Sequence, residues 1–276
     1  MNPHAQHPSS LAAMWRSVYC NRSLIWQLMQ REIKGRYRGS ILGISWSFFQ
    51  PLLMLAVYTF VFSVVLQTTW RGEMSNGKVN FAIILFSGLI VHGLFSECVN
   101  RAPTLVLTSV NLVKRVVFPL EILAVVMVGV TVFHIIVGLL ILFAAMLLFG
   151  LDFHGTIFYL PLVLSPLILM TLGLTWFLAA AGVYLRDLGH VVVVVSTILL
   201  FLSPIFYPIS AVPEQIRMLI YLNPLTFIIE QVRAVLLWGE TPSWAGLLIY
   251  WVCSLFVAWL GFFVFQWIRK GFSDVL

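Results

Sequence analysis

The sequence predicts an all-α integral membrane protein with six transmembrane helices. Hydrophobic residues make up 61% of the chain and charged residues only 9%, whereas soluble domains carry about 25% charged residues. The first apolar run, residues 41–66, contains no charged residue. As a helix it would be about 39 Å long, which exceeds the roughly 30 Å of a hydrocarbon core.

Charge then orients the predicted helices. The even number of spans places both termini on one side of the membrane. Twelve of the 16 Lys and Arg residues fall on that side, so the positive-inside rule predicts that both termini are cytoplasmic. These cations crowd the span ends, where they suit membrane lipid headgroups rather than nucleic acid. The six predicted spans are residues 41–66, 79–97, 120–149, 159–185, 191–208 and 244–268.

The segment before the first span is predicted to be an amphipathic helix in the cytoplasmic interface. Within residues 15–34, Ile25, Leu28, Met29 and Ile33 recur at helical spacing, and polar residues fall on the opposite side. Two interpretations remain open at this point. The helix is either a simple membrane anchor or a docking surface for a cytoplasmic partner.

Two cytoplasmic loops join the predicted spans. Residues 100–118 are too short and basic to span the membrane, but too apolar for a solvated linker. They suit an amphipathic helix that either contacts another protein or folds back on the bundle. Residues 184–190 form a tight turn in which Arg186 and Asp187 are either solvated charges or partner contacts.

The outer segment 209–240 is too apolar for an exposed loop. Pro213 marks a helix start, and Asn223-Pro224 interrupts the apolar run that follows. Two half-helices that dip into the outer leaflet explain this pattern, with Glu230 and Arg233 spaced to pair at i,i+3. Because non-spanning backbone at membrane depth often lines a pathway, we expect this hairpin to be a lid over a pore.

The chain lacks the motifs of an enzyme or a nucleotide site. It has three aspartates and no D-x-D pair, and its three cysteines indicate neither a disulfide nor a zinc site. Residues 72–78 resemble a phosphate-binding loop, but Val79 replaces the Ser or Thr that would bind magnesium. Any ATP that drives transport is therefore expected on another polypeptide, and no cofactor or metal is expected here.

Ionisable and aromatic residues within the spans suggest possible pathways. A proton relay would use His92, Glu97 or His134. Aromatic rings stack on the apolar faces of sugars, although they also serve as lipid belt and bundle packing. The aromatic residues expected along a glycan pathway are Tyr58, Phe62, Phe206 and Tyr207.

Several motifs in a fixed order resemble those of type-2 ABC exporter permeases. Within that group, the chain is most similar to the transmembrane subunits of O-antigen, capsule and teichoic-acid exporters. The resemblance runs from Trp15 to Arg269. It is carried by Arg31-Glu32-Ile33, Arg36-Tyr37-Arg38, Gln50-Pro51-Leu52, Leu112-Val113-Lys114, Phe118-Pro119-Leu120-Glu121, Arg186-Asp187-Leu188, Ser203-Pro204-Ile205-Phe206-Tyr207-Pro208 and Leu222-Asn223-Pro224-Leu225-Thr226.

The resemblance implies a homodimer in a bacterial inner membrane. Each subunit would have a cytoplasmic part, residues 1–40, and a membrane domain, residues 41–276. The dimer would join two ATPase subunits that bind ATP and magnesium, and it would export a lipid-linked polysaccharide. A coupling helix at 103–116 and gate helices at 213–237 are also implied.

The same resemblance assigns roles to residues. The expected ATPase-coupling residues are Arg31, Lys34, Asn111, Lys114, Arg115, Arg186 and Asp187. The expected outer-gate residues are Pro213, Asn223, Pro224, Glu230 and Arg233. The alternatives are a proton-coupled lipid or glycan flippase, a type-2 exporter of teichoic acid or a drug, and a membrane-embedded glycan-modifying enzyme.

Overall fold

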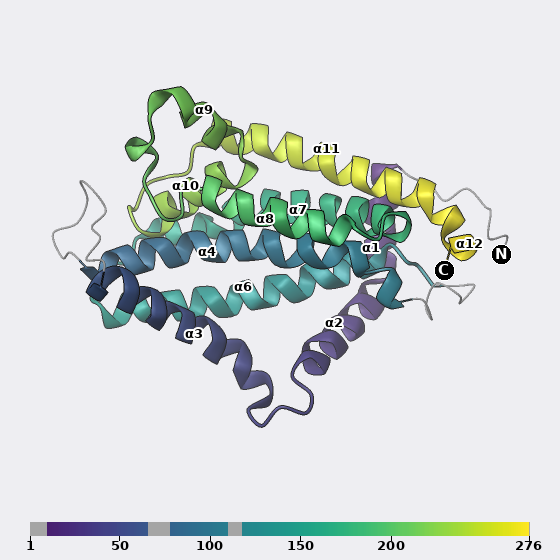
Figure 1. Cartoon of the computed structure of the whole chain (residues 1–276), viewed down its shortest axis with the longest axis horizontal. Helices are drawn as coiled ribbons and strands as arrows, with labels where there is room; N and C mark the ends of the chain where they lie inside the picture. Colours follow the sequence, from purple (N-terminus) through teal and green to yellow (C-terminus); the bar gives the residue numbers. More distant parts are fainter. Residues whose placement is uncertain (1–9, 66–77, 110–117, 276) are drawn as a thin grey trace.

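The computed structural model describes residues 10–65, 78–109 and 118–275, and every regular element in this part of the chain is a helix. Five of these helices are long and apolar enough to cross a membrane, which confirms the predicted all-α membrane fold. Four of the five run along the longest dimension of the molecule (Figure 1). They are α4 (Lys78–Arg101), α6 (Ile122–Leu148), α7 (Leu160–Tyr184) and α11 (Trp244–Ile268).

The first predicted span is irregular at both ends. A 3-10 turn (Gly43–Ser45) precedes α3 (Trp46–Tyr58), and a π-helix (Thr59–Val65) continues it. Only 11% of the apolar window of this span is buried within the chain, against 78% for the window in α4. The helix α4 therefore lies at the centre of the subunit, whereas α3 lies at its edge.

The fifth predicted span is shorter than expected. The helix α8 (Leu188–Leu202) has 15 residues and is about 22 Å long, so it ends before the predicted boundary at residue 208. Ser203 adopts an extended conformation with ψ 147°. The next residue, Pro204, explains this ending because a proline disfavours helical backbone at the residue before it.

The predicted interface helix is two helices rather than one. A break at Asn21 separates α1 (Leu11–Cys20) from α2 (Arg22–Arg36). The side-chain amide of Asn21 donates to the carbonyl of Ser17 at 2.8 Å. The same carbonyl accepts from the backbone N–H of Asn21 at 3.2 Å, so the side chain adds a second bond at the end of α1, a local pattern that favours a helix end.

The apolar side of α2 packs on α6. Ile25 is buried against Ile122 and Val126, and Met29 lies directly over Gly129. In Figure 1, α2 and α3 form the two arms of a V whose point, at the loop between them, lies away from the bundle. The segment thus joins the membrane helices through an apolar contact on one side.

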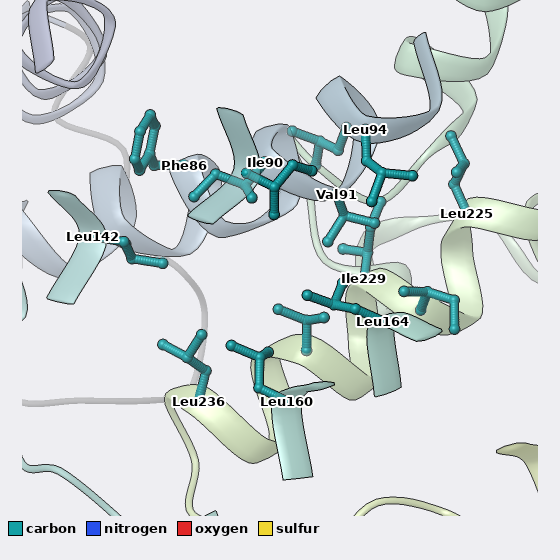
Figure 2. Packing of buried hydrophobic residues seen from close by; sticks show 14 of the residues in the cluster. Phe86, Ile90, Val91, Leu94, Leu142, Leu160, Leu164, Leu225, Ile229 and Leu236 are labelled. Atoms are coloured by element: carbon teal, nitrogen blue, oxygen red, sulfur yellow. The ribbon is translucent and has the colours of Figure 1, made fainter. Parts of the chain in front are cut away.

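The main core joins the central helices to α10 (Pro224–Leu236), the second helix of the outer hairpin. Figure 2 shows Phe86, Ile90 and Leu94 of α4 in the same cluster as Leu160 and Leu164 of α7 and Leu225, Ile229 and Leu236 of α10. Because lipid tails are as apolar as these side chains, close packing rather than the hydrophobic effect stabilises such contacts within a membrane.

Small residues allow α7 to approach its neighbours closely. A Cβ atom on Gly261 of α11 would overlap the carbonyl of Gly173, and one on Gly182 would overlap the backbone of Pro103. The small-residue face of α7 is therefore used for packing within the chain. The short α12 (Phe272–Val275) follows α11, and its Phe272 is buried beside Phe265 of α11.

Candidate functional site

The outer hairpin consists of α9 (Glu214–Leu222) and α10, which are bent by 91° relative to each other. The predicted break at Asn223-Pro224 is present. The Asn223 carboxamide oxygen accepts from the backbone N–H of Leu225 at 3.0 Å, and Pro224 occupies the first turn of α10. Asn223 also donates to the hydroxyl of Ser203 at 2.9 Å, which ties the bend to the end of α8.

Arg233 fixes this hairpin to the bundle. Its side chain is fully buried and donates to the carbonyls of Pro204 at 2.6 Å, Ile205 at 3.2 Å and Ile84 at 3.2 Å. The predicted pair with Glu230 is also present, at 3.3 Å. A guanidinium suits this position because its planar array of donors can satisfy several carbonyls where helices end.

We call these bonds of Arg233 to backbone carbonyls the Arg233 clamp. The sequence predicts only the pair of Arg233 with Glu230 and not the clamp. A signal was available, since a cation within an apolar run is costly in a membrane and therefore needs a specific set of partners. The partners themselves lie 28 to 149 residues away along the chain, so the sequence did not reveal them.

The structure divides the predicted aromatic pathway into two places. The rings of Phe62 and Phe206 lie 6.2 Å apart, and Phe201 stacks on Phe206 at 5.8 Å. Tyr207 joins this group by donating its hydroxyl to the carbonyl of Phe201 at 2.8 Å. Tyr58 instead lines a separate cleft between α3, α4 and α6.

The expected coupling residues are also dispersed. Arg31 and Lys34 line a cavity of about 1500 Å³ on the charged side of α2. Arg186 and Asp187 are both exposed in the turn between α7 and α8. Asn111, Lys114 and Arg115 lie outside the described residues, as do most of the rejected phosphate-loop segment 72–78 and residues 110–116 of the expected coupling helix.

The described part of the expected coupling helix begins with two short 3-10 turns, Ala102–Thr104 and Leu107–Ser109. The first turn packs on α7, where Pro103 lies over Gly182. This segment therefore folds back on the bundle where it is described, which was one of the two arrangements expected for it.

Five charged or titratable residues form a network at the end of α2. Arg36 contacts Glu97 at 2.6 Å, and the same carboxylate meets His134 at 3.0 Å. Arg101 lies 3.7 Å from Glu97 and 2.5 Å from Glu32. Two arginines thus balance two carboxylates, so the ion pairs neutralise the charges that α2, α4 and α6 bring together.

Two charged groups contact the His134 ring. Its Nδ1 atom lies 3.0 Å from both the Glu97 carboxylate and the Arg36 guanidinium, and its Nε2 atom lies 3.2 Å from the same guanidinium. Tyr37 lies beside the same ring, with its hydroxyl 3.4 Å from Nε2, and burial raises the pKa of this phenol above its usual value.

A second ion pair closes the other side of the same end of the bundle. Arg269 donates to the Glu121 carboxylate at 2.6 Å and to the carbonyl of Phe118 at 3.0 Å. The hydroxyl of Ser17 donates to the other Glu121 oxygen at 2.8 Å. The backbone carbonyl of Glu121 accepts from the Trp176 indole at 2.8 Å. These bonds connect α1, α6, α7 and α11.

The described residues offer no constellation for metal-dependent chemistry, since they contain no group of three His, Cys, Asp or Glu side chains arranged to hold a metal ion. His92, one of the expected relay residues, contacts the backbone carbonyl of Ser196 at 3.2 Å. The polar groups instead hold helix breaks, helix ends and the base of a cleft. Together with the long apolar helices, this arrangement defines a helical membrane domain.

Comparison with known proteins identifies the family. The profile of the ABC-2 type transporter family matches residues 23–237, and the chain belongs to that family. This finding confirms the resemblance to type-2 ABC permeases and also agrees with a transport subunit rather than an enzyme.

Several relatives match almost end to end. The chain is 29% identical over 263 residues to the O-antigen export system permease protein RfbA of Myxococcus xanthus, with 94% of this chain and 97% of the relative covered. It is 21% identical to the RfbA protein of Klebsiella pneumoniae, with coverage of 90% and 93%. It is 25% identical to the polysialic acid transport protein KpsM of Escherichia coli, with coverage of 83% and 88%.

Proposed function

We propose that this chain is the channel-forming subunit of an ATP-driven exporter that moves a lipid-linked polysaccharide of the O-antigen type across the bacterial inner membrane. The observation that carries the proposal is the near end-to-end match to O-antigen export permeases, combined with membership of the ABC-2 family. The match covers the membrane helices, the hairpin and α2 together, so it supports a shared transport architecture.

The energy would come from a partner. Two copies of an ABC ATPase subunit would bind ATP and magnesium and would dock on a homodimer of this chain. The contacts proposed for docking are Arg31, Lys34, Asn111, Lys114, Arg115, Arg186 and Asp187. The exposure of Arg186 and Asp187, and the open cavity beside Arg31 and Lys34, support this placement.

The proposed topology has both termini in the cytoplasm. The distribution of 12 cations on that side and four on the other supports it. The end of the bundle that carries α1, α2 and α12 would then meet the ATPase. The hairpin of α9 and α10 would lie at the opposite, outer side, where Pro213, Asn223, Pro224, Glu230 and Arg233 shape the proposed gate.

The proposed glycan pathway runs along α3 towards this gate. Tyr58 would contact the glycan first, and the group of Phe62, Phe206 and Tyr207 would contact it near the hairpin. The grouping of Phe62, Phe201 and Phe206, in which Phe201 stacks on Phe206, supports this assignment, since clustered rings present aromatic faces to sugars.

Purification from native membranes tests the proposal. The tagged chain should retain a P-loop ATPase at about one copy per permease. After reconstitution into vesicles, transport of the native glycolipid should require ATP. Transport by the chain alone under a proton gradient would overturn the proposal in favour of the secondary flippase, in which the Glu97 and His134 pair would carry the proton.

A further inference from the structure

A cleft of about 490 Å³ lies between α3, α4 and α6. Each helix contributes one face, since its lining residues recur every three or four positions. The positions are 47, 50, 51, 54 and 58 of α3, 86, 89, 90, 93 and 97 of α4, and 131, 134, 135 and 138 of α6. A volume between about 300 and 1,000 Å³ is typical of small-molecule sites.

The lining combines charged, amide and aromatic groups. Arg36, Glu97 and His134 form one side, and their ion pair and hydrogen bonds hold these groups in fixed positions. Gln50 and Tyr58 lie on the α3 side. Glu97 and His134 belong to predicted spans, where ionisable groups are costly and usually mark a functional site, so this combination calls for a polar occupant.

Gly93 keeps the cleft open. A Cβ atom at this position would meet no other atom within 4 Å, whereas one at Gly88 on the same helix would lie 3.1 Å from the Arg233 guanidinium. Glycine weakens a helix relative to alanine, and no neighbouring backbone requires it at position 93. The absence of a side chain at position 93 therefore leaves space within the cleft.

We infer that this cleft binds a sugar unit of the transported glycan, an inference that rests on the proposed function. Sugar hydroxyl groups both donate and accept hydrogen bonds. Arg36, Glu97 and Gln50 offer both kinds of partner, and the Tyr58 ring offers an apolar face. The site is an addition to the aromatic group near the hairpin.

Charge argues against two other occupants. A phosphate would need unpaired cations, but Arg36 is already paired with Glu97 and Arg101 with Glu32. A lipid acyl chain would leave the carboxylate and guanidinium beside hydrocarbon, which is costly. An uncharged, hydroxyl-rich ring suits the charge balance of the cleft.

A size series at Gly93 tests the inference while leaving the ion network in place. We expect export of surface glycan to fall in the order of side-chain size, least for Gly93→Ala and by at least about tenfold for Gly93→Leu and Gly93→Trp. Because these residues favour helix over glycine, loss of α4 would not explain a loss of export. Retention of the ATPase on purification checks assembly, and normal export by an assembled Gly93→Trp protein would overturn the inference.

Photo-crosslinking provides a second measurement that does not depend on those variants. The photoreactive residue p-benzoylphenylalanine would replace Met54, which lines the cleft, or Phe158, which is 88% exposed and lies outside it. We expect glycan adducts at position 54 and not at position 158 in exporting cells. Adducts to lipid alone at position 54, or no glycan adduct there while export continues, would overturn the site.

Deletion of the chain distinguishes failure of the proposed function from failure of the cleft as a sugar site. If deletion of the chain leaves surface polysaccharide unchanged, the proposed function is wrong and the site loses its basis. If deletion abolishes surface polysaccharide but the assembled Gly93→Trp protein exports normally, only the cleft inference is wrong.

Discussion

Arg233 and Arg36 are both held against the helical bundle, but their partners differ in kind. Arg233 is fully buried. Three of its partners are backbone carbonyls, that of Ile84 within α4 and those of Pro204 and Ile205 just after the end of α8. Arg36 has a side chain that is 36% exposed, and its partners are the side chains of Glu97 and His134. The first arginine completes the fold, while the second lies beside open space.

The comparison separates polar groups that stabilise this protein from polar groups that are available to a ligand. Backbone carbonyls cannot rotate away, so a guanidinium that satisfies them holds helices at fixed positions. Side-chain partners can also bond to a ligand, because a carboxylate and a guanidinium each have more than one acceptor or donor site. Burial by the chain itself and the kind of partner therefore distinguish the two roles better than the presence of charge.

The largest effect is expected from Arg233→Met. This change removes the guanidinium donor of the Pro204 and Ile205 carbonyls in a buried place, and one of the donors of the Ile84 carbonyl, so the free energy of unfolding should fall by about 3–5 kcal/mol. Thermal unfolding of the purified subunit in detergent measures it. Arg217→Met is the matched control, because Arg217 belongs to the same hairpin and donates to a single carbonyl, that of Val212. Equal losses in the two variants would contradict the clamp.

The next effect is expected from Arg269→Met. The change removes the donor of Glu121 and of the Phe118 carbonyl, at a cost of about 1–3 kcal/mol. Ser17 of α1 donates to Glu121, and Arg269 holds that carboxylate in place. Loss of Arg269 should therefore also make α1 more sensitive to protease. The adjacent Lys270→Met change provides a control for lost positive charge. If the control destabilised the protein equally, net charge rather than this ion pair would be responsible.

The sequence predicted the parts of this comparison that depend on local signals. Long apolar runs marked the spans, and Asn223-Pro224 marked the bend of the hairpin, because a capping side chain and a proline act on their own neighbours. The two errors of extent have equally local causes. Asn21 bonds to Ser17 and divides the predicted interface helix, and Pro204 ends α8.

The sequence did not predict the sites that depend on the packing of distant helices. Glu97 and His134 were noted as ionisable residues within spans, but nothing local joined them to Arg36. These three residues lie on α4, α6 and α2, and only the crossing of those helices brings them together. Likewise, Tyr58 and Phe62 lie in the same apolar stretch of the sequence, whereas the structure places the Tyr58 and Phe62 side chains in different surroundings.

Glu97→Gln sharpens the comparison between the two arginines. Because the pair with Arg36 is partly exposed, the free energy of unfolding should change by no more than about 1 kcal/mol. Glycan export should fall much more than stability if the cleft is a binding site. Parallel measurements of unfolding and export give both values, with Glu32→Gln as a control in the same network but outside the cleft lining. A loss of stability as large as that of Arg233→Met would show that the Arg36 pair stabilises the fold as much as Arg233 does, and would contradict the proposed difference between the two arginines.

The smallest effect is expected from Tyr207→Phe. The change removes one partly solvated hydrogen bond to Phe201 and keeps the ring, so the free energy of unfolding should fall by about 0.5 kcal/mol. Export should be retained if the aromatic group near the hairpin acts through its faces, and Tyr207→Ala should then reduce export while the subunit still assembles. If Tyr207→Phe lost as much export as Tyr207→Ala, the hydroxyl rather than the ring would be the functional group. The region near the hairpin would then resemble the polar cleft more than the stacked aromatic rings suggest.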